Sequence, residues 1–509
     1  MMTAPVTPYR SQAAAGRESF WHLVHAEWTK FRTVRGWMIA MIVAVMAVTA
    51  FVFLASNVSS SCSGSACPAP PAGPGGEPVT DAFYFAHQPL TGNGTITVQM
   101  TSLAGQVAAG PSQTVPGLQP WSKAGIIIKQ NTSQGSAYAA MMVTGSHGVR
   151  MQWDYVNDTP GPGKGAGEAG GVSASAPRWL RLVRTGGTIT GYDSADGTHW
   201  TLAGTATLPG LTSTVQAGLF AAGSSDNFGT MATGVFRHIG LSWPATGWTG
   251  TNIGGYANAA GTPLPGTLRQ SAGTITVASF GDISPAAGSG QSLQRALAGT
   301  FFGLIPLIVV AAMFITAEYR RALIHASLTA APRRGRLLAA KAVVIGAVGF
   351  VAGLAAATLA LGVGTPLLLR AGPLAWPVSL LTEARMVAGT GALLAVAAVL
   401  ALAIGTIVRR SAPAVAIVIV VIIVPYLLSF GPLSSGNGPG GSGGWELQIT
   451  PAAALSVQQA VPQFHQLIAN YSPNGGYYPL APWAGLAVEC AWAAAALALA
   501  YYLLRRRDA

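Results

Sequence analysis

The chain has 509 residues, of which 50% are hydrophobic and only 9% are charged. Ordinary soluble domains carry roughly 25% charged residues, so this composition excludes a typical soluble protein and favours a membrane protein. The formal net charge of +12 would also fit a nucleic-acid-binding protein, and the distribution of the charges along the chain must decide between the two.

Residues 1–35 are expected to be cytoplasmic and to hold an amphipathic helix. In the stretch FWHLVHAEWTKFRTVRGW, residues 20–37, apolar side chains recur at helical spacing and basic side chains lie off that stripe. A helix of this kind lies on a membrane surface with its aromatic rings in the interface and its bases towards lipid headgroups. We therefore expect a cytoplasmic interfacial helix that contacts membrane lipid. Its principal members are Trp28, Lys30, Phe31 and Arg32. A plain lipid anchor and a contact for a cytoplasmic partner both remain open.

Apolar segments long enough to cross the membrane follow. The first, 36–56, comes directly after the amphipathic helix, and about 20 apolar residues span roughly 30 Å of hydrocarbon. It is too long for a secretory signal, so we expect an uncleaved span. Five more candidates bring the expected number of spans to six: 297–317, 339–365, 384–408, 412–430 and 483–504.

Basic residues predict the orientation of these spans. With the N-terminus inside, the inside segments hold 16 of the 28 lysines and arginines but only four of the 16 acids, whereas the outside segments hold 12 of each. The entire net charge then lies on one side of the membrane. This predicts a multi-pass plasma-membrane protein with both termini cytoplasmic, and nucleic-acid binding loses its support.

The residues between the first two spans are expected outside the cell. Residues 57–79 form a Ser/Gly/Pro-rich linker, in which Cys62 and Cys67 are close enough to form a disulfide in an oxidising compartment. Bridged and free states both remain open. The third cysteine, Cys490 in the sixth span, is expected to be a small buried hydrophobe.

From residue 80 to residue 243 the apolar pattern alternates with a period of two. Turn signals at Gly186-Gly187 and Asp196-Gly197 separate short runs, which predicts many strands and hence an extracellular β-sandwich. Residues 244–296 alternate more weakly, and we expect them to form a β-rich collar between the sandwich and the membrane.

Several of these strands carry a family resemblance. WSKAGIIIKQ, YAAMMVT, PRWLRLVRTGGTITGYDSADGTHWTLAGTATLPG and VQAGLFAAG together resemble the concanavalin-like jelly-roll domains found beside bacterial glycan-active proteins. The resemblance implies sugar binding, with an extracellular glycan as a partner. The aromatic side chains available to stack on a sugar ring are Trp153, Tyr192 and Trp200, although most aromatics in a sandwich belong to its core.

The carboxylates of the sandwich are poor candidates for catalysis. Asp154 with Asp158, and Asp193 with Asp196, stand beside turns, where aspartate usually stabilises the turn. We expect neither a hydrolase pair nor a metal site, with calcium binding as the minor alternative.

The chain also lacks a nucleotide-binding motif. GPGKGAGEAGG, residues 161–171, has no Ser or Thr after its lysine, as a phosphate-binding loop requires. We therefore expect a protein that is not an enzyme, uses no cofactor and takes its energy from a partner. Glu489 is the exceptional ionisable residue within the spans, and its shallow depth favours hydration from the outer interface. A secondary transporter would need more such groups.

The cytoplasmic loop 317–341 reads AEYRRALIHASLTAAPRRGRLLAAK. It continues the second span as a helix, breaks at Ala331-Pro332 and becomes basic before the third span. A short helix–break–helix segment suits docking into a groove on a cytoplasmic protein, and the alternative is simple positive-inside anchoring. The residues expected to couple to an ATPase are Glu318, Tyr319, Arg320, Arg321, Arg333 and Arg334.

A second resemblance covers the membrane part. HAEWTKFRTVRGW, TAEYRR…APRRGRLLAAKAVVIG, six spans and the terminal LLRRRDA, in that order, resemble actinobacterial permeases of the type-2 ABC exporter family. The resemblance implies a half-transporter that pairs with a second permease subunit, as a homo- or heterodimer, and binds a separate cytoplasmic ABC ATPase. The loop 317–341 would carry the coupling helix, and the opening helix would also contact the ATPase.

We therefore predict an α-helical polytopic membrane protein with six transmembrane helices and an inserted all-β extracellular sandwich. Its predicted function is that of the permease subunit of an ATP-driven ABC exporter. The alternative is a glycan-sensing or envelope-scaffolding receptor whose sandwich binds carbohydrate and whose helices anchor it.

Overall fold

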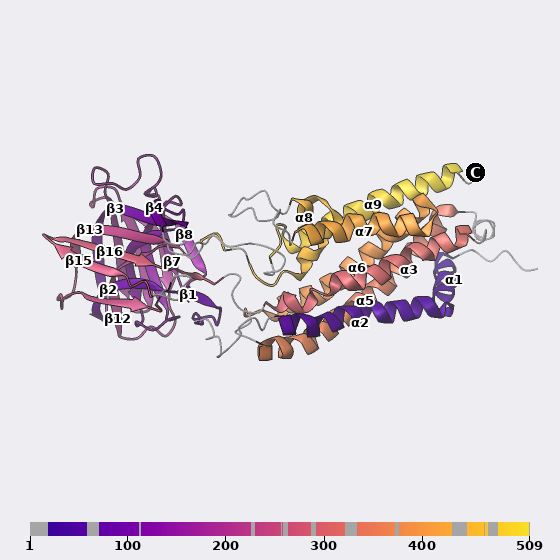
Figure 1. The fold of residues 1–509 in the computed structure, drawn as a ribbon, viewed down its shortest axis with the longest axis horizontal. Coiled ribbons are helices and arrows are strands. Elements are labelled where there is room, and N and C mark those ends of the chain that lie inside the picture. Colours follow the sequence, from indigo (N-terminus) through magenta and orange to yellow (C-terminus); the bar gives the residue numbers. More distant parts are fainter. Residues whose placement is uncertain are drawn as a thin grey trace, which may run out of the picture.

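The computed structural model describes residues 19–58, 71–110, 113–224, 230–255, 257, 263–286, 292–320, 333–371, 376–429, 445–462, 464–466 and 477–507. A helical bundle and a β-sandwich lie end to end, and the sandwich is inserted in the chain between the first two long helices (Figure 1). We call the end of the bundle that faces the sandwich the proximal end and the opposite end the distal end.

The described part of the chain contains six helices that are long and apolar enough to cross a membrane, which confirms the predicted spans. They contain α2 (Arg35–Val58), α3 (Thr300–Arg320), α5 (Arg334–Ala371), α6 (Leu380–Val408), α7 (Ser411–Leu428) and α9 (Pro482–Arg507). Shorter helices are α1 (Phe20–Thr33) and α8 (Glu446–Ile449), with 3₁₀ turns η1 (Leu293–Leu297) and η3 (Pro451–Gln458).

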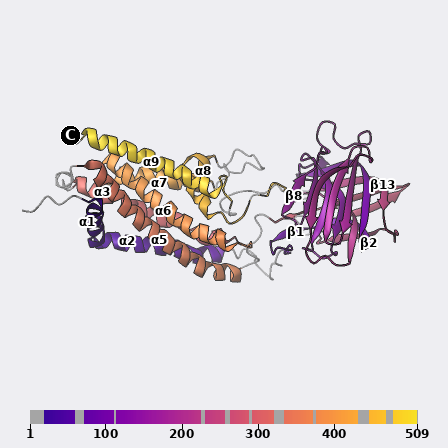
Figure 2. The same ribbon diagram turned by 180° about the vertical axis from the view of Figure 1, so that it is seen from behind.

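Helix α1 lies across the distal end of the bundle (Figures 1 and 2). The chain bends between α1 and α2 at Val34, whose backbone is extended. The apolar stripe of α1 faces the bundle, because the Phe31 ring is only 1% exposed and packs against Phe314 of α3 and Trp37 of α2. Burying one such ring contributes about 2 kcal/mol, so α1 is held by packing as well as by charge.

Glycine permits the close packing of α5 on α6. A Cβ atom added to Gly353 would lie 2.8 Å from the Cα of Gly391, and one added to Gly349 would lie 2.8 Å from the Leu394 carbonyl oxygen. Both distances are shorter than any side chain tolerates, so the two helices touch through their backbones.

The β region consists of two large antiparallel sheets and a two-stranded neck. The first sheet has the order β11-β10-β9-β3-β13-β16-β15, with β4 also paired to β3, and the second has the order β14-β2-β12-β5-β6-β7-β8. Their bounds are β2 Phe83–Thr91, β3 Gly94–Gly110, β4 Gln113–Pro116, β5 Lys123–Lys129, β6 Tyr138–Thr144, β7 Val149–Trp153, β8 Asn157–Pro160, β9 Arg178–Thr185, β10 Thr188–Ser194, β11 Thr201–Thr207, β12 Thr214–Ala222, β13 Met231–Leu241, β14 Thr249–Ile253, β15 Thr267–Ser271 and β16 Thr274–Phe280.

The predicted strands form, and so do their turns: Gly186 and Gly197 both have positive φ, which glycine adopts without strain. Strands β5 and β6 are buried on both faces, which explains the continuous apolar run of AGIIIKQ. One face contributes to the core between the two sheets, and the other lies under a second apolar cluster that includes Phe83 and Phe220.

The segment that we expected as a separate collar, 244–296, instead extends the two sheets. Strand β14 pairs with β2 at the edge of the second sheet, and β16 pairs with β13 in the first. Those neighbours present open strand edges, and the alternation of TITVASF places Ile275 and Val277 in the core.

The neck joins the sandwich to the bundle. It pairs β1 (Val79–Asp81), where the chain enters the sandwich, with β17 (Ile283–Pro285), where it leaves. Two buried lysines at opposite ends of β5 form ion pairs that hold the neck against the sandwich. The Lys129 Nζ lies 2.8 Å from Asp81 Oδ2, and the Lys123 Nζ lies 2.8 Å from Asp282 Oδ1.

Candidate functional site

Four charged side chains meet at the distal end, where α1, α3 and α5 converge. The Lys341 Nζ of α5 donates to Glu27 Oε2 of α1 at 2.6 Å and to Glu318 Oε1 of α3 at 2.7 Å. The Lys30 Nζ donates to Glu27 Oε1 at 2.7 Å and to Glu318 Oε1 at 3.2 Å. We call these four residues the distal ion cluster. It has two acids and two bases, so it is neutral as a unit.

The cluster is buried except at Lys30. The side chains of Lys341 and Glu27 are 0% and 2% exposed, that of Glu318 is 12% exposed, and that of Lys30 is 44% exposed. The Lys341 ammonium also lies 4.6 Å from the ring centroid of Phe314, a favourable cation–π distance. Removing any one buried partner would leave an uncompensated charge in an apolar setting, so the cluster binds three helices into one unit.

Electrostatics favour the charged form of the exposed lysine. Burial lowers the pKa of Lys30, but the hydrogen bond and charge of Glu27, together with the charge of Glu318, outweigh that effect and raise its pKa above the ordinary value. Lys30 therefore remains charged at physiological pH. Glu318 lies in the last turn of α3, where the helix dipole disfavours an acid, so its position depends on the two lysines rather than on its own helix.

The residues predicted for ATPase coupling lie around this cluster. Glu318 points inward and is paired within the chain, and Tyr319 is half-buried with the Arg409 guanidinium 5.0 Å from its ring centroid. Arg320 and Arg333 are exposed, at the end of α3 and just before α5. The Arg334 Nη1 donates to the Leu504 carbonyl oxygen of α9 at 2.8 Å.

Residues 321–332, including Arg321 and the expected break at Pro332, lie outside the described residues. So do Cys62 and Cys67.

The predicted interfacial residues divide between two environments. Phe31 is buried against the bundle, and Lys30 belongs to the distal ion cluster while its side chain stays 44% exposed. Trp28 and Arg32 are exposed, and Trp28 stacks on Phe31.

The three predicted glycan-contact residues are not all together. Trp153 packs against the core between the sheets from β7. Tyr192 and Trp200 are half-buried beside the first sheet, and both are neighbours of Arg181: Tyr192 is its partner across β9 and β10, and the Trp200 ring centroid lies 3.8 Å from its guanidinium carbon. Arg181 thus joins two of the three predicted residues.

The carboxylates of the sandwich take separate protein partners. Asp158 pairs with Arg150, Asp193 with Arg178, and Asp196 with His199, while Asp154 accepts the Tyr138 backbone N–H. Hydrogen bonds from the side chain and the backbone N–H of exposed His199, and from Thr198, keep the pKa of Asp196 below its usual range. Among the described residues, no group of three or more His, Cys, Asp or Glu side chains is placed to hold a metal ion.

Two expectations for the sixth span are corrected. Glu489 is not hydrated from the interface, because it is only 1% exposed, and its Oε2 has no hydrogen-bond partner among the described residues. It lies one turn after Gly485, whose Cα is packed against η3, so η3 shields this face of α9. Cys490 is exposed on α9 rather than buried.

Sequence reasoning missed two members of the distal ion cluster, Glu27 and Lys341. A signal for each was present: Glu27 is an acid within an otherwise basic amphipathic helix, and Lys341 stands in the apolar start of the third span. A lysine within a membrane span needs an acidic partner, but Glu27, which pairs with Lys341, lies 314 positions away in the sequence.

No curated protein matches the sequence. Among solved structures, a match is "the crystal structure of a functionally unknown protein from Saccharomyces cerevisiae", at 15% identity and a TM-score of 0.21, over 31% of this chain and 74% of that one. The model of the family described as "ABC-2 family transporter protein" matches residues 21–509. That match spans the six membrane helices, the inserted sandwich and the distal ion cluster, and the chain therefore belongs to the ABC-2 family of transporter proteins.

Proposed function

We propose that this ABC-2 permease is the membrane subunit of an ATP-driven exporter whose distal end faces the cytoplasm and receives energy from a separate ATPase. ABC-2 permeases generally pair with ATPase subunits. A second permease subunit, identical or related, completes the transporter. The orientation is supported by the bases of the distal end, including exposed Arg32, Arg320 and Arg333, because basic loops stay on the cytoplasmic side.

The distal ion cluster is the observation that carries the coupling role. The loop between α3 and α5 is the central part of the segment 317–341, and the cluster ties the helix ends that flank this loop to α1 through Glu318 and Lys341. A push on the loop therefore moves three helices together rather than bending one of them. In this arrangement Glu318 acts inside the protein, and the exposed Arg320 and Arg333 meet the ATPase.

The test compares two double variants that remove the same charge from the same end of the protein. R320A/R333A alters the flanks of the loop, whereas R505A/R506A alters exposed arginines at the end of α9. Both retain enough basic residues for insertion. We expect R320A/R333A to weaken co-purification of the ATPase and to reduce the ATPase activity that the permease stimulates, while R505A/R506A resembles the wild type. Equal behaviour of the two variants would refute docking at the loop.

The orientation has its own test, in a variant without native cysteines. A cysteine at exposed Thr201 of the sandwich should react with a membrane-impermeant thiol reagent in intact cells, and a cysteine at Ser411, at the distal start of α7, should react only after permeabilisation. Labelling of S411C in intact cells would reverse the proposed topology.

A further inference from the structure

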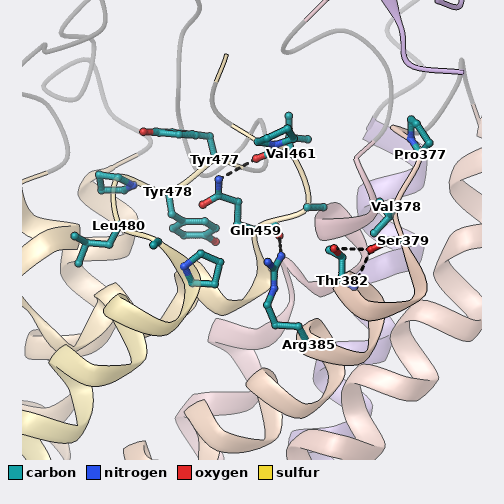
Figure 3. Close-up of a pocket in the computed structure, with 15 residues that line it drawn as sticks. Pro377, Val378, Ser379, Thr382, Arg385, Gln459, Val461, Tyr477, Tyr478 and Leu480 are labelled. Carbon is teal, nitrogen blue, oxygen red and sulfur yellow. Dashed lines mark hydrogen bonds between the residues drawn. The ribbon is translucent and has the colours of Figure 1, made fainter. Parts of the chain in front are cut away.

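A polar cavity and an apolar groove lie at opposite ends of the bundle. The cavity, of about 640 Å³, opens at the proximal end, where the start of α6, the end of η3 and the start of α9 meet (Figure 3). Arg385 lines it and donates through Nη2 to the Gln459 carbonyl oxygen, and we call it the Arg385 cavity. The groove, of about 430 Å³, lies at the distal end between α1, α2 and α5, and every described residue that lines it is apolar. The groove therefore suits a hydrocarbon ligand.

The two walls of the groove come from α2 and α5, and in each wall side chains recur one helical turn apart. The α2 wall consists of Met38, Ile42 and Met46, and the α5 wall consists of Ala347, Val351 and Ala355. Eight residues of helix rise about 12 Å, so the groove covers less than half of the roughly 30 Å of hydrocarbon. The side chains of Ile42, Met46 and Val351 are 61%, 58% and 64% exposed. The groove therefore opens sideways towards lipid.

The groove is short because it is closed at both ends. On its proximal side, Val48 and Val52 of α2 are fully buried in one cluster with alanines of α5 such as Ala356. On its distal side, α1 covers it with Trp28, whose ring stacks on that of Phe31. A membrane helix of a second subunit would pack along a whole span, whereas this groove ends after about two turns of α2. These dimensions favour a single acyl chain.

Two exposed arginines stand at the distal end of the groove. Arg32 follows Trp28 by four residues on α1, and Arg35 precedes Met38 by three residues on α2. Each arginine therefore lies on the same helix face as a residue that lines the groove. Neither arginine pairs with an acid among the described residues. Because the guanidinium fork matches two oxygens of a phosphate group, the pair favours a phosphate beside the groove.

An apolar groove with a basic end matches one class of molecule. We propose that the groove holds one acyl chain of an anionic phospholipid, whose phosphate lies between Arg32 and Arg35. A zwitterionic phospholipid also carries a cationic group, which the two arginines repel. Under the proposed orientation the site lies in the cytoplasmic leaflet, where anionic lipids gather. The inference goes beyond the proposed function, because the bound lipid holds α1 against α2 and α5 in addition to the distal ion cluster.

Native mass spectrometry of the full chain in detergent, without an ATPase, counts the lipids that stay bound. The probes are phosphatidylglycerol and phosphatidylcholine with the same acyl chains, and glycerol phosphate as a headgroup without chains. We expect the wild type to retain one phosphatidylglycerol in preference to the other two. R32Q/R35Q should weaken that retention about 10-fold, because it removes charge-assisted hydrogen bonds to the phosphate. R505Q/R506Q removes the same charge from the same end and should bind as the wild type does.

A second pair of variants tests the acyl chain. A355F places a ring in the groove, whereas A491F places the same ring at an exposed position of α9. We expect A355F to lose retention of phosphatidylglycerol and A491F to keep it. Phosphatidylglycerol should also slow amide hydrogen exchange in α1 of the wild type and of A491F, but not of A355F, because the lipid holds α1 only when its chain fills the groove.

Thermal unfolding of each variant checks that it is folded, and A355F keeps the test decisive if R32Q/R35Q does not insert. Equal retention of the two phospholipids, or unchanged retention of phosphatidylglycerol in R32Q/R35Q or A355F, would overturn the proposal. Glycerol phosphate bound as tightly as phosphatidylglycerol would overturn the role of the chain. A lipid-free dimer that A355F dissociates would assign the groove to a second copy instead. Because no ATPase is present, any of these failures leaves the proposed coupling function untouched.

Discussion

The neck of the sandwich and the distal end of the bundle both bury lysine, but they do so differently. In the neck, Lys123 and Lys129 each pair with one aspartate, and all four side chains are at most 1% exposed. At the distal end, Lys341 is shared by two glutamates that also bind half-exposed Lys30. A lysine buried with a single aspartate, as in the neck, has one pairing arrangement. In the distal ion cluster two lysines share two glutamates next to water, so they can exchange partners.

The difference fits the two positions in the chain. The neck pairs fix the strands by which the chain enters and leaves the sandwich, and the Tyr155 hydroxyl donates to Asp81 Oδ2 at 2.6 Å to reinforce them. The distal ion cluster joins three helices that the proposed ATPase would move. Buried charge therefore fixes the neck in one arrangement, and under the proposed function it would link the three helices that the ATPase moves.

Breaking a neck pair should have the largest effect. K129M leaves the Asp81 carboxylate buried without its base, and loss of one partner of a buried pair costs about 3–5 kcal/mol. We expect the free energy of unfolding of the sandwich to fall by that amount in pulse proteolysis of the full chain. K164M, which changes an exposed lysine, is the control. A K129M sandwich as stable as that of K164M would show that the neck does not depend on this pair.

Breaking the distal ion cluster should cost less. K341M leaves two acids with Lys30 alone, and Lys30 and water compensate in part, so we expect a loss of roughly 2–3 kcal/mol. Faster amide hydrogen exchange in α1 would report it. K341M/E318Q restores a balance of one acid and one base and should recover part of the protection. If the double variant were no better than K341M, charge balance would not explain the cluster.

Removing the exposed member should matter least among the lysines. In K30M, Lys341 still holds both glutamates, and an ion pair with a 44% exposed partner contributes about 0.2–1 kcal/mol. We expect exchange in α1 to change by less than in K341M. An effect of K30M as large as that of K341M would contradict the difference between the buried and exposed members.

The smallest effect concerns pH dependence beside the neck. Burial raises the pKa of Asp154 from 3.8 to about 6, Glu77 adds to this rise, and the Tyr138 N–H and Lys129 oppose it. The folded state binds more protons than the unfolded state between these values, so Asp154 makes stability fall as pH rises from about 4 to about 6. D154N should flatten that slope in chemical denaturation, whereas D196N should not. The effect is modest because Asp154 is only partly buried. An unchanged slope in D154N would assign it to another group.

The sequence by itself determined the spans, the strands and the one-sided charge, because these depend on local properties. A run of apolar residues long enough for a bilayer predicts a membrane span, and alternation such as that of TITVASF predicts a strand. Both can be recognised without knowing which residues pack against them. The same holds for the amphipathic stripe of α1. The sequence also placed Lys30 and Glu318 among the candidates at the distal end, although it assigned them to lipid and to a partner protein.

The tertiary structure alone decided which charges meet and which surfaces are covered. Lys341 pairs with Glu27 across 314 positions, Glu489 is buried one turn after the point where α9 packs on η3, and β14 and β16 join the edges of the two sheets rather than a separate collar. The Arg385 cavity likewise forms from α6, η3 and α9, which are remote in sequence. Each depends on packing between distant segments, because desolvation and pairing of a charge are set by neighbours that no local pattern encodes.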